Sequence, residues 1–110
     1  MRGNSAENQA LKYLRKQGLK PVTSNYRSRY GEIDLIMQHG ATLVFVEVRY
    51  RAAEQYGGAA ASVDPRKQQK LIRTAAAYLQ SHDADALCRF DVVAINGSSQ
   101  INWIQSAFTA

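Results

Sequence analysis

Two apolar runs separated by a short turn dominate the middle of the chain, at residues 32–38 (EIDLIMQ) and 42–49 (TLVFVEVR). Both are rich in Ile, Leu, Val and Phe, which favours β-strands, and His39-Gly40 predicts a tight hairpin turn between them. A third such run, residues 88–95 (CRFDVVAI), comes after a helical segment at 65–81. Because a helix between two strands of one sheet implies a crossover and parallel pairing, the order predicts a mixed sheet with helices on both faces.

The flanking segments extend this α/β pattern at both ends. Residues 4–17 predict a helix that Asn4 caps and Gly18 ends, and residues 20–26 predict a weak edge strand. Residues 101–104 predict a short last strand. We expect two sets of inward-facing helical residues: Ala6, Ala10, Tyr13, Leu14 and Gln17 in the first helix, and Ile72, Ala75, Ala76 and Leu79 in the second.

A loop is expected at residues 50–63, before Asp64-Pro65 opens the second helix with an N-cap and a first-turn proline. Its small residues and its Gly57-Gly58 pair predict a mobile segment. With 110 residues in all, the chain is expected to form a single domain, 1–110.

Composition narrows the class of partner. No apolar run approaches the ~20 residues that a membrane span needs, so we expect no membrane partner. Cys88 is the only cysteine, which excludes a disulfide framework or a zinc cluster and is typical of the reducing cytoplasm. The 14 Lys and Arg residues against 9 Asp and Glu residues give a net charge of +5, which favours a polyanionic partner, nucleic acid before membrane.

The basic residues are bunched along the sequence. The candidate nucleic-acid contacts are Arg27, Arg29, Arg51, Arg66, Lys67, Lys70 and Arg73. A solvated helix face would present the same charges without any binding function. Tyr26 and Tyr30, beside the first arginines, could stack on nucleic acid or could simply pack.

Polar residues inside the apolar strands are the strongest functional signal. If His39-Gly40 is a two-residue turn, Ile36 lies opposite Leu43, Asp34 opposite Phe45 and Glu32 opposite Glu47. Glu32, Asp34, Glu47 and Arg49 then share one face of the sheet. Asp34 and Glu47 become diagonal neighbours, roughly 7–8 Å apart at Cα, a separation at which two carboxylates can share one divalent cation.

Clustered acids on one face repel each other, and a hard cation such as Mg²⁺ would relieve that repulsion. A network of ion pairs would produce the same pattern without a metal. In that network Glu47 would pair with Arg49 or Arg51, and Glu32 with Arg27 or Arg29. Gln68 and Glu7 are equally open to two interpretations. Gln68 points inward to join the site or to cap a loop carbonyl, and Glu7 joins the acidic cluster or caps its own helix.

Five segments resemble the YraN-like family of small bacterial proteins: residues 6–14 (AENQALKYL), 25–51 (NYRSRYGEIDLIMQHGATLVFVEVRYR), 57–79 (GGAAASVDPRKQQKLIRTAAAYL), 89–95 (RFDVVAI) and 101–108 (INWIQSAF). That family is similar to the restriction-endonuclease-like PD-(D/E)xK nucleases and, among them, to the Holliday junction resolvases. The resemblance implies an α/β fold with a three-layer αβββαβ core.

The resemblance also implies roles for individual residues. Asp34 matches the motif aspartate, Glu47 the (D/E)xK glutamate, Glu7 the acid of the first helix and Gln68 the polar position of the following helix. Arg49 stands where the motif has lysine. Because arginine does not deprotonate in proteins, Arg49 could stabilise charge but could not act as a base. Lys67 of the facing helix could supply the missing amine.

The function expected from the resemblance is that of a Mg²⁺- or Mn²⁺-dependent nuclease acting on DNA, including branched or structured DNA. Asp34, Glu47, the Val48 carbonyl and Glu7 would hold the ion, and a homodimer would offer two sites to two scissile strands. The alternatives are a catalytically silent nucleic-acid-binding module that retains the fold and a protein-interaction subunit whose acids are structural.

Overall fold

The computed structural model of the chain describes residues 5–51 and 63–110, with Arg51 described in its backbone only. Its elements, in chain order, are α1 (Ser5–Lys16), β1 (Lys20–Ser28), β2 (Gly31–His39), β3 (Thr42–Arg51), α2 (Pro65–His82), β4 (Leu87–Asn96) and β5 (Ile101–Phe108). The predicted α/β order is confirmed, and the first and last strands are longer than expected. The predicted loop, with its Gly57-Gly58 pair, and the Asn4 cap lie largely or wholly outside the described residues.

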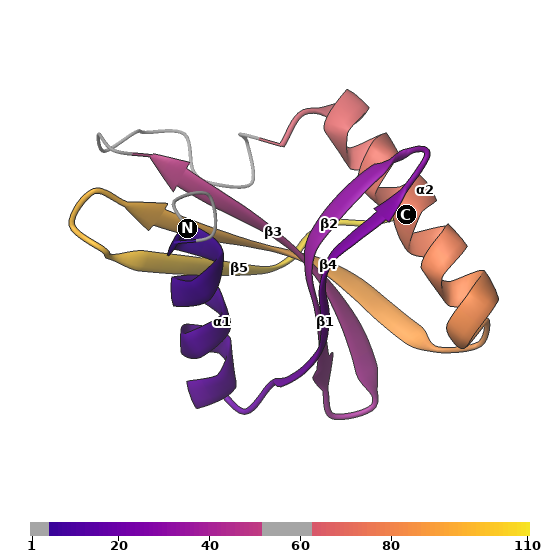
Figure 1. Cartoon of the computed structure of the whole chain (residues 1–110), viewed down its shortest axis with the longest axis horizontal. Coiled ribbons are helices and arrows are strands. Elements are labelled where there is room, and N and C mark those ends of the chain that lie inside the picture. Colours follow the sequence, from indigo (N-terminus) through magenta and orange to yellow (C-terminus); the bar gives the residue numbers. More distant parts are fainter. Residues whose placement is uncertain (1–4, 52–62) are drawn as a thin grey trace.

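The five strands form one mixed sheet in the order β1-β2-β3-β4-β5. β3 and β4 run parallel, as the crossover through α2 requires, and every other neighbouring pair is antiparallel. The helices α1 and α2 lie on opposite sides of this sheet (Figure 1). The arrangement is compatible with the three-layer nuclease-like core that the resemblance implies. Among the described residues, no helix is both long and apolar enough to cross a membrane.

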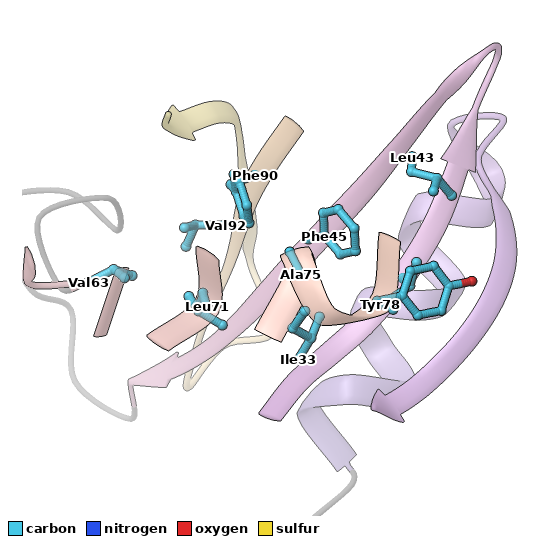
Figure 2. Packing of buried hydrophobic residues seen from close by; sticks show 10 residues of the cluster. Ile33, Leu43, Phe45, Val63, Leu71, Ala75, Tyr78, Phe90 and Val92 are labelled. Atoms are coloured by element: carbon cyan, nitrogen blue, oxygen red, sulfur yellow. The ribbon is translucent and has the colours of Figure 1, made fainter. Parts of the chain in front are cut away.

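The larger hydrophobic cluster lies between α2 and the sheet. Figure 2 shows Leu71, Ala75 and Tyr78 of α2 packed over sheet residues that include Phe45 and Phe90, whose rings stack 5.5 Å apart. The inward face of α2 agrees with the prediction in part. Ala75 is buried and Ile72 and Leu79 pack, partly buried, against the cluster as predicted, but Ala76 is exposed. Leu71, Thr74 and Tyr78 are buried and were not predicted.

The second cluster lies under α1, where Ala10 and Leu14 pack on Val44 and Val46 of β3. Ala6 and Tyr13 are partly buried against it, as predicted, but Gln17 lies beyond the helix and is exposed. Gly18, with φ +98°, ends the helix by adopting the left-handed conformation that glycine tolerates best.

The β2–β3 hairpin corrects the predicted register. His39 pairs with Thr42, so the two-residue loop is Gly40-Ala41 and not His39-Gly40. Gly40 has φ +62°, which a hairpin loop needs at its first central position and which glycine supplies without strain. Ile36 consequently lies opposite Phe45, not Leu43. The shift is two residues along the partner strand, so the side-chain faces are preserved.

We expect the cluster under α2 to dominate stability. Replacing Phe45, which is almost fully buried, with alanine should lower the free energy of unfolding by about 3–5 kcal/mol because it leaves a cavity between sheet and helix. Urea denaturation would measure the loss. Leu87→Ala is the matched control, since Leu87 is 67% exposed at the start of β4. A similar loss in both variants would contradict this account of the core.

Candidate active site

Asp34 and Glu47 meet at the point where β2 separates from β3. The last β2–β3 pair is Leu35 with Val46, one residue before each carboxylate along the ladder. There the Asp34 carboxylate accepts a hydrogen bond from the backbone N–H of Val48 at 2.8 Å. The side chain of β2 thus replaces a backbone carbonyl as the hydrogen-bond partner of β3. Continued by one residue, the observed register places Asp34 opposite Glu47 and not diagonal to it as predicted.

Both carboxyl groups are easier to protonate than usual. Burial, together with the charges of Glu47 and Glu7, raises the pKa of Asp34 to about 7 against the opposing Val48 hydrogen bond. Burial also raises the pKa of Glu47, which is only 5% exposed, while Lys67 and Arg49 oppose that rise. Two neighbouring acids with raised pKa values repel each other when both are ionised. A bound cation would relieve that repulsion.

Two cations lie beside Glu47. Arg49 follows it on the same face of β3, with Nε 3.5 Å from Oε2 of the glutamate. Lys67 reaches the same oxygen from the first turn of α2, with Nζ at 3.6 Å. Asp64 fixes the beginning of that helix, because its carboxylate accepts the Lys67 N–H at 2.8 Å. The structure therefore brings a lysine amine to the acidic pair from another element.

The third acid of the cluster is Glu7, and the predicted Glu32 lies in an ion pair elsewhere. Glu7 of α1 acts electrostatically on Asp34 and accepts a hydrogen bond from Nδ2 of Asn25 at 3.0 Å. Glu32 instead pairs with Arg27 at 3.5 Å. Asn25 was not predicted, since it lies in a strand with ordinary polar composition. Its φ of +52° turns the backbone locally on β1.

Gln68 makes the contact that the capping interpretation predicts. Its Nε2 donates to the backbone carbonyl of Val63 at 2.8 Å. Val63 is buried just before the Asp64 cap of α2. The amide thus stabilises the beginning of α2. Among the described residues, no hydrogen bond joins the Gln68 side chain to Asp34 or Glu47.

Another buried carboxylate shows what a purely structural acid looks like in this fold. Asp91 is fully buried and accepts hydrogen bonds from Arg89, Trp103 and the Ser106 backbone, at 3.0, 2.9 and 3.0 Å. Trp103 and Ser106 thereby hold β5 against β4 where the register of the two strands shifts. Asp34, by contrast, has one backbone donor and two acidic neighbours.

The acidic pair can hold a metal ion only with help from other donors. Within residues 5–51 and 63–110, no three His, Cys, Asp or Glu side chains are grouped as metal ligands. Mg²⁺ does not require three, because it commonly binds one or two carboxylates and keeps several waters. Two carboxylates beside the Val48 backbone therefore fit this ion, and Glu7 fits as a partner through water.

The predicted nucleic-acid contacts lie in different parts of the surface. Lys70 and Arg73 are exposed on α2, on the same helix as Lys67, and Arg66 is exposed in its first turn. Arg27 and Arg29 are exposed at the end of β1 and in the following turn. The side chain of Arg51 lies outside the described part of the chain.

The chain is a small α/β protein with a mixed sheet. Its candidate site is a pair of carboxylates where β2 and β3 stop pairing, and a lysine from the crossover helix contacts this pair. The chain belongs to uncharacterised protein family UPF0102, whose sequence model matches residues 6–95. This confirms the resemblance to YraN-like proteins. It is 54% identical over 107 residues to the UPF0102 protein of Nitrosomonas eutropha, covering 97% of this chain and 92% of the relative. The UPF0102 protein of Aeromonas hydrophila is 53% identical over 110 residues, covering 97% and 84%.

The raised pKa of Asp34 predicts a pH-dependent gain in stability when its charge is removed. The stabilisation of the folded state is present below the unfolded pKa of about 4 and is lost as the pH rises through about 7, because the folded carboxyl binds its proton more tightly. Asp34→Asn, which keeps an acceptor for Val48, should therefore stabilise the protein above pH 7 by about 1–2 kcal/mol after allowance for solvent screening.

Denaturation in the presence of a chelator at several pH values would measure this effect. Asp85→Asn removes the same charge from an exposed position and controls for the change in net charge. An Asp34→Asn variant that is less stable than the wild type at every pH would contradict the assignment.

Proposed function

We propose that this protein is a Mg²⁺- or Mn²⁺-dependent nuclease that hydrolyses phosphodiester bonds in DNA, including branched or structured DNA. The observation that supports this most is the pair formed by Asp34 and Glu47. Both carboxyl groups have raised pKa values, and a lysine amine lies 3.6 Å from the second. Neighbouring carboxylates removed from water lower the stability of a fold, so their presence favours a functional role.

In this proposal the chain holds the ion with Asp34, Glu47 and the backbone carbonyl of Val48, and Glu7 contributes through water. When bound, the ion would lower the pKa of a coordinated water and neutralise charge on the phosphate. Asp34 would then be ionised, since an adjacent positive charge lowers the pKa of a carboxyl group.

Arg49 and Lys67 divide the work that a single motif lysine would do. Arg49 keeps its proton and stabilises the negative charge that develops on the phosphate. Lys67 carries an amine that can orient the attacking water and exchange a proton with it. Both reach the same oxygen of Glu47, so their charges are held at the acidic pair before any substrate arrives.

DNA binding would come from charge and not from base-specific contacts. Lys70 and Arg73 continue along α2 from Lys67, and the net charge of +5 favours a polyanion. Binding should therefore weaken with added salt and depend little on sequence. For a branched substrate a homodimer would supply two sites. The lone Cys88 supports the cytoplasm, where DNA is accessible, as the compartment.

Cleavage of a branched DNA substrate is the direct test. With Mg²⁺ or Mn²⁺ the wild type should cut, and Asp34→Asn or Glu47→Gln should cut at least about a hundredfold more slowly because each removes a ligand of the ion. Mg²⁺ should also raise the melting temperature of the wild type and not that of Asp34→Asn. Asp85→Asn is the control in both assays. Cleavage that survives in a chelator would contradict the metal-dependent mechanism.

The division of roles between the two cations predicts distinct effects. Lys67→Ala should reduce the cleavage rate by about 10²- to 10⁴-fold, as expected for the loss of a proton-transfer group. Arg49→Lys should keep or increase activity, and it should partly rescue Lys67→Ala by restoring an amine on β3. Lys70→Ala, one turn further along α2, is the matched control and should mainly weaken DNA binding. Full activity in Lys67→Ala would remove Lys67 from the mechanism.

The arrangement at Glu47 also favours a second function, a nucleic-acid-binding module without catalysis. Arg49 and Lys67 balance this buried carboxylate without any metal, and Arg49 replaces the lysine of the motif. Such a module would bind DNA in a salt-dependent way, unchanged by a chelator, and would not cut it. Absence of DNA binding even at low salt would leave the protein-interaction subunit.

A further inference from the structure

The turn between β1 and β2 is fastened to helix α2. The Tyr30 backbone N–H donates to Oγ of Ser28 at 3.0 Å, and that hydroxyl lies 3.1 Å from Oγ1 of Thr74. Thr74 is fully buried and also donates to the Lys70 carbonyl at 2.8 Å. A side chain on Gly31 would contact both Lys70 and Thr74 at 3.6 Å. The turn is therefore fastened to α2 at the buried Thr74.

Tyr30 is the aromatic residue that this turn displays. The residue is 37% exposed, and the Arg29 guanidinium lies over its ring at 5.2 Å from the centroid. Nη2 of Arg29 also donates to the Tyr30 hydroxyl at 3.2 Å. The hydrogen bond and charge of Arg29 and, more weakly, the charge of Arg73 lower the pKa of Tyr30. Neighbouring Tyr26 differs, because its ring packs edge-on against Tyr78 at 5.1 Å.

Helix α2 connects this turn to the acidic pair. Lys67, Lys70 and Arg73 are spaced three residues apart and so form one stripe along the helix, with a rise of about 9 Å from first to last. Lys67 contacts Glu47 at one end of the stripe, and the β1–β2 turn contacts the helix at Thr74, next to Arg73 at the other end. A strand whose phosphates follow the stripe from the acidic pair would bring its bases to the exposed ring.

We propose that Tyr30, backed by Arg29, is a stacking platform for an unpaired nucleobase of the DNA strand that enters the site along α2. A base can stack on a protein ring only if its own face is uncovered, and in an intact duplex both faces are covered by neighbouring pairs. The platform therefore selects substrates with unpaired nucleotides next to the cleaved bond. This inference rests on the proposed function for the cleavage step, while the binding step stands by itself.

Binding measured without metal tests the platform separately from catalysis. Fluorescence anisotropy in a chelator would compare a labelled single-stranded oligonucleotide with the fully paired duplex of the same sequence. Tyr30→Ala should weaken single-strand binding about five- to a hundredfold, the range expected for loss of one base–aromatic stack, and leave duplex binding unchanged. Tyr30→Phe, which retains the ring but loses the hydrogen bond to Arg29, should bind like the wild type.

Tyr50→Ala is the matched control. Tyr50 is 55% exposed and lies two residues after Val48, on the same face of β3, which places it on the α1 side, away from α2. Equal weakening by Tyr30→Ala and Tyr50→Ala, or equal loss of single-strand and duplex binding in Tyr30→Ala, would overturn the platform. Circular dichroism of each variant would confirm that the fold is retained.

The two proposals fail in different ways. Single-strand binding that depends on Tyr30, in a protein that cuts no DNA with Mg²⁺ or Mn²⁺, would uphold the platform and refute the nuclease. A protein that cuts DNA, and in which Tyr30→Ala alters neither binding nor the preference for unpaired substrates, would uphold the nuclease and refute the platform.

Discussion

The parallel pairing of β3 with β4 is the constraint on which the rest of the structure depends. Parallel neighbours cannot be joined by a tight turn, so the chain must cross the sheet through α2. The crossover buries one face of α2 against the larger hydrophobic cluster and sets its first turn near the end of β3 that carries Glu47. The same helix also receives the β1–β2 turn through Thr74. One topological requirement thus brings together residues from distant parts of the chain.

The site itself works against the stability that this packing provides. Asp91 shows that the sheet can bury a carboxylate with a full set of donors. Asp34 has a single backbone donor and faces Glu47 and Glu7, so its ionised form is held at a free-energy cost. The β2–β3 divergence is what makes this possible, because regular pairing beyond Leu35 would supply Val48 with a backbone acceptor instead of Asp34. The interrupted ladder is thus the structural origin of the unusual electrostatics.

The order of elements and the meeting of Asp34 with Glu47 could be predicted because both depend on local patterns. The apolar strands and the helix between two of them can be identified without knowing the turn. The face on which each side chain lies is also predicted correctly when the turn is misplaced by an even number of residues. The register could not, since it depends on Gly40 adopting a positive φ at the first loop position. The inward face of α2 was only partly predicted, because apolar residues occur on several sides of that helix: Ala76 is exposed, while Leu71 and Tyr78 are buried. The pairing of Glu32 with Arg27 agrees with the ion-pair alternative, because the two residues are close in the sequence, whereas the contact of Asn25 with Glu7 leaves no pattern in the sequence.

Spacing along a strand is a poor guide to which amine serves an acidic pair. A motif read along β3 ends at Arg49, whose guanidinium keeps its proton throughout. Lys67 follows Arg49 by eighteen residues, and the crossover brings it to the same oxygen of Glu47. Its Nζ lies 3.6 Å from that oxygen, and Nε of Arg49 lies 3.5 Å from it. Because the Asp64 cap fixes the first turn of α2, that amine arrives on a helical scaffold as well defined as the strand. Although Arg49 stands where the motif would have a lysine, Lys67 therefore still places an amine at the acidic pair.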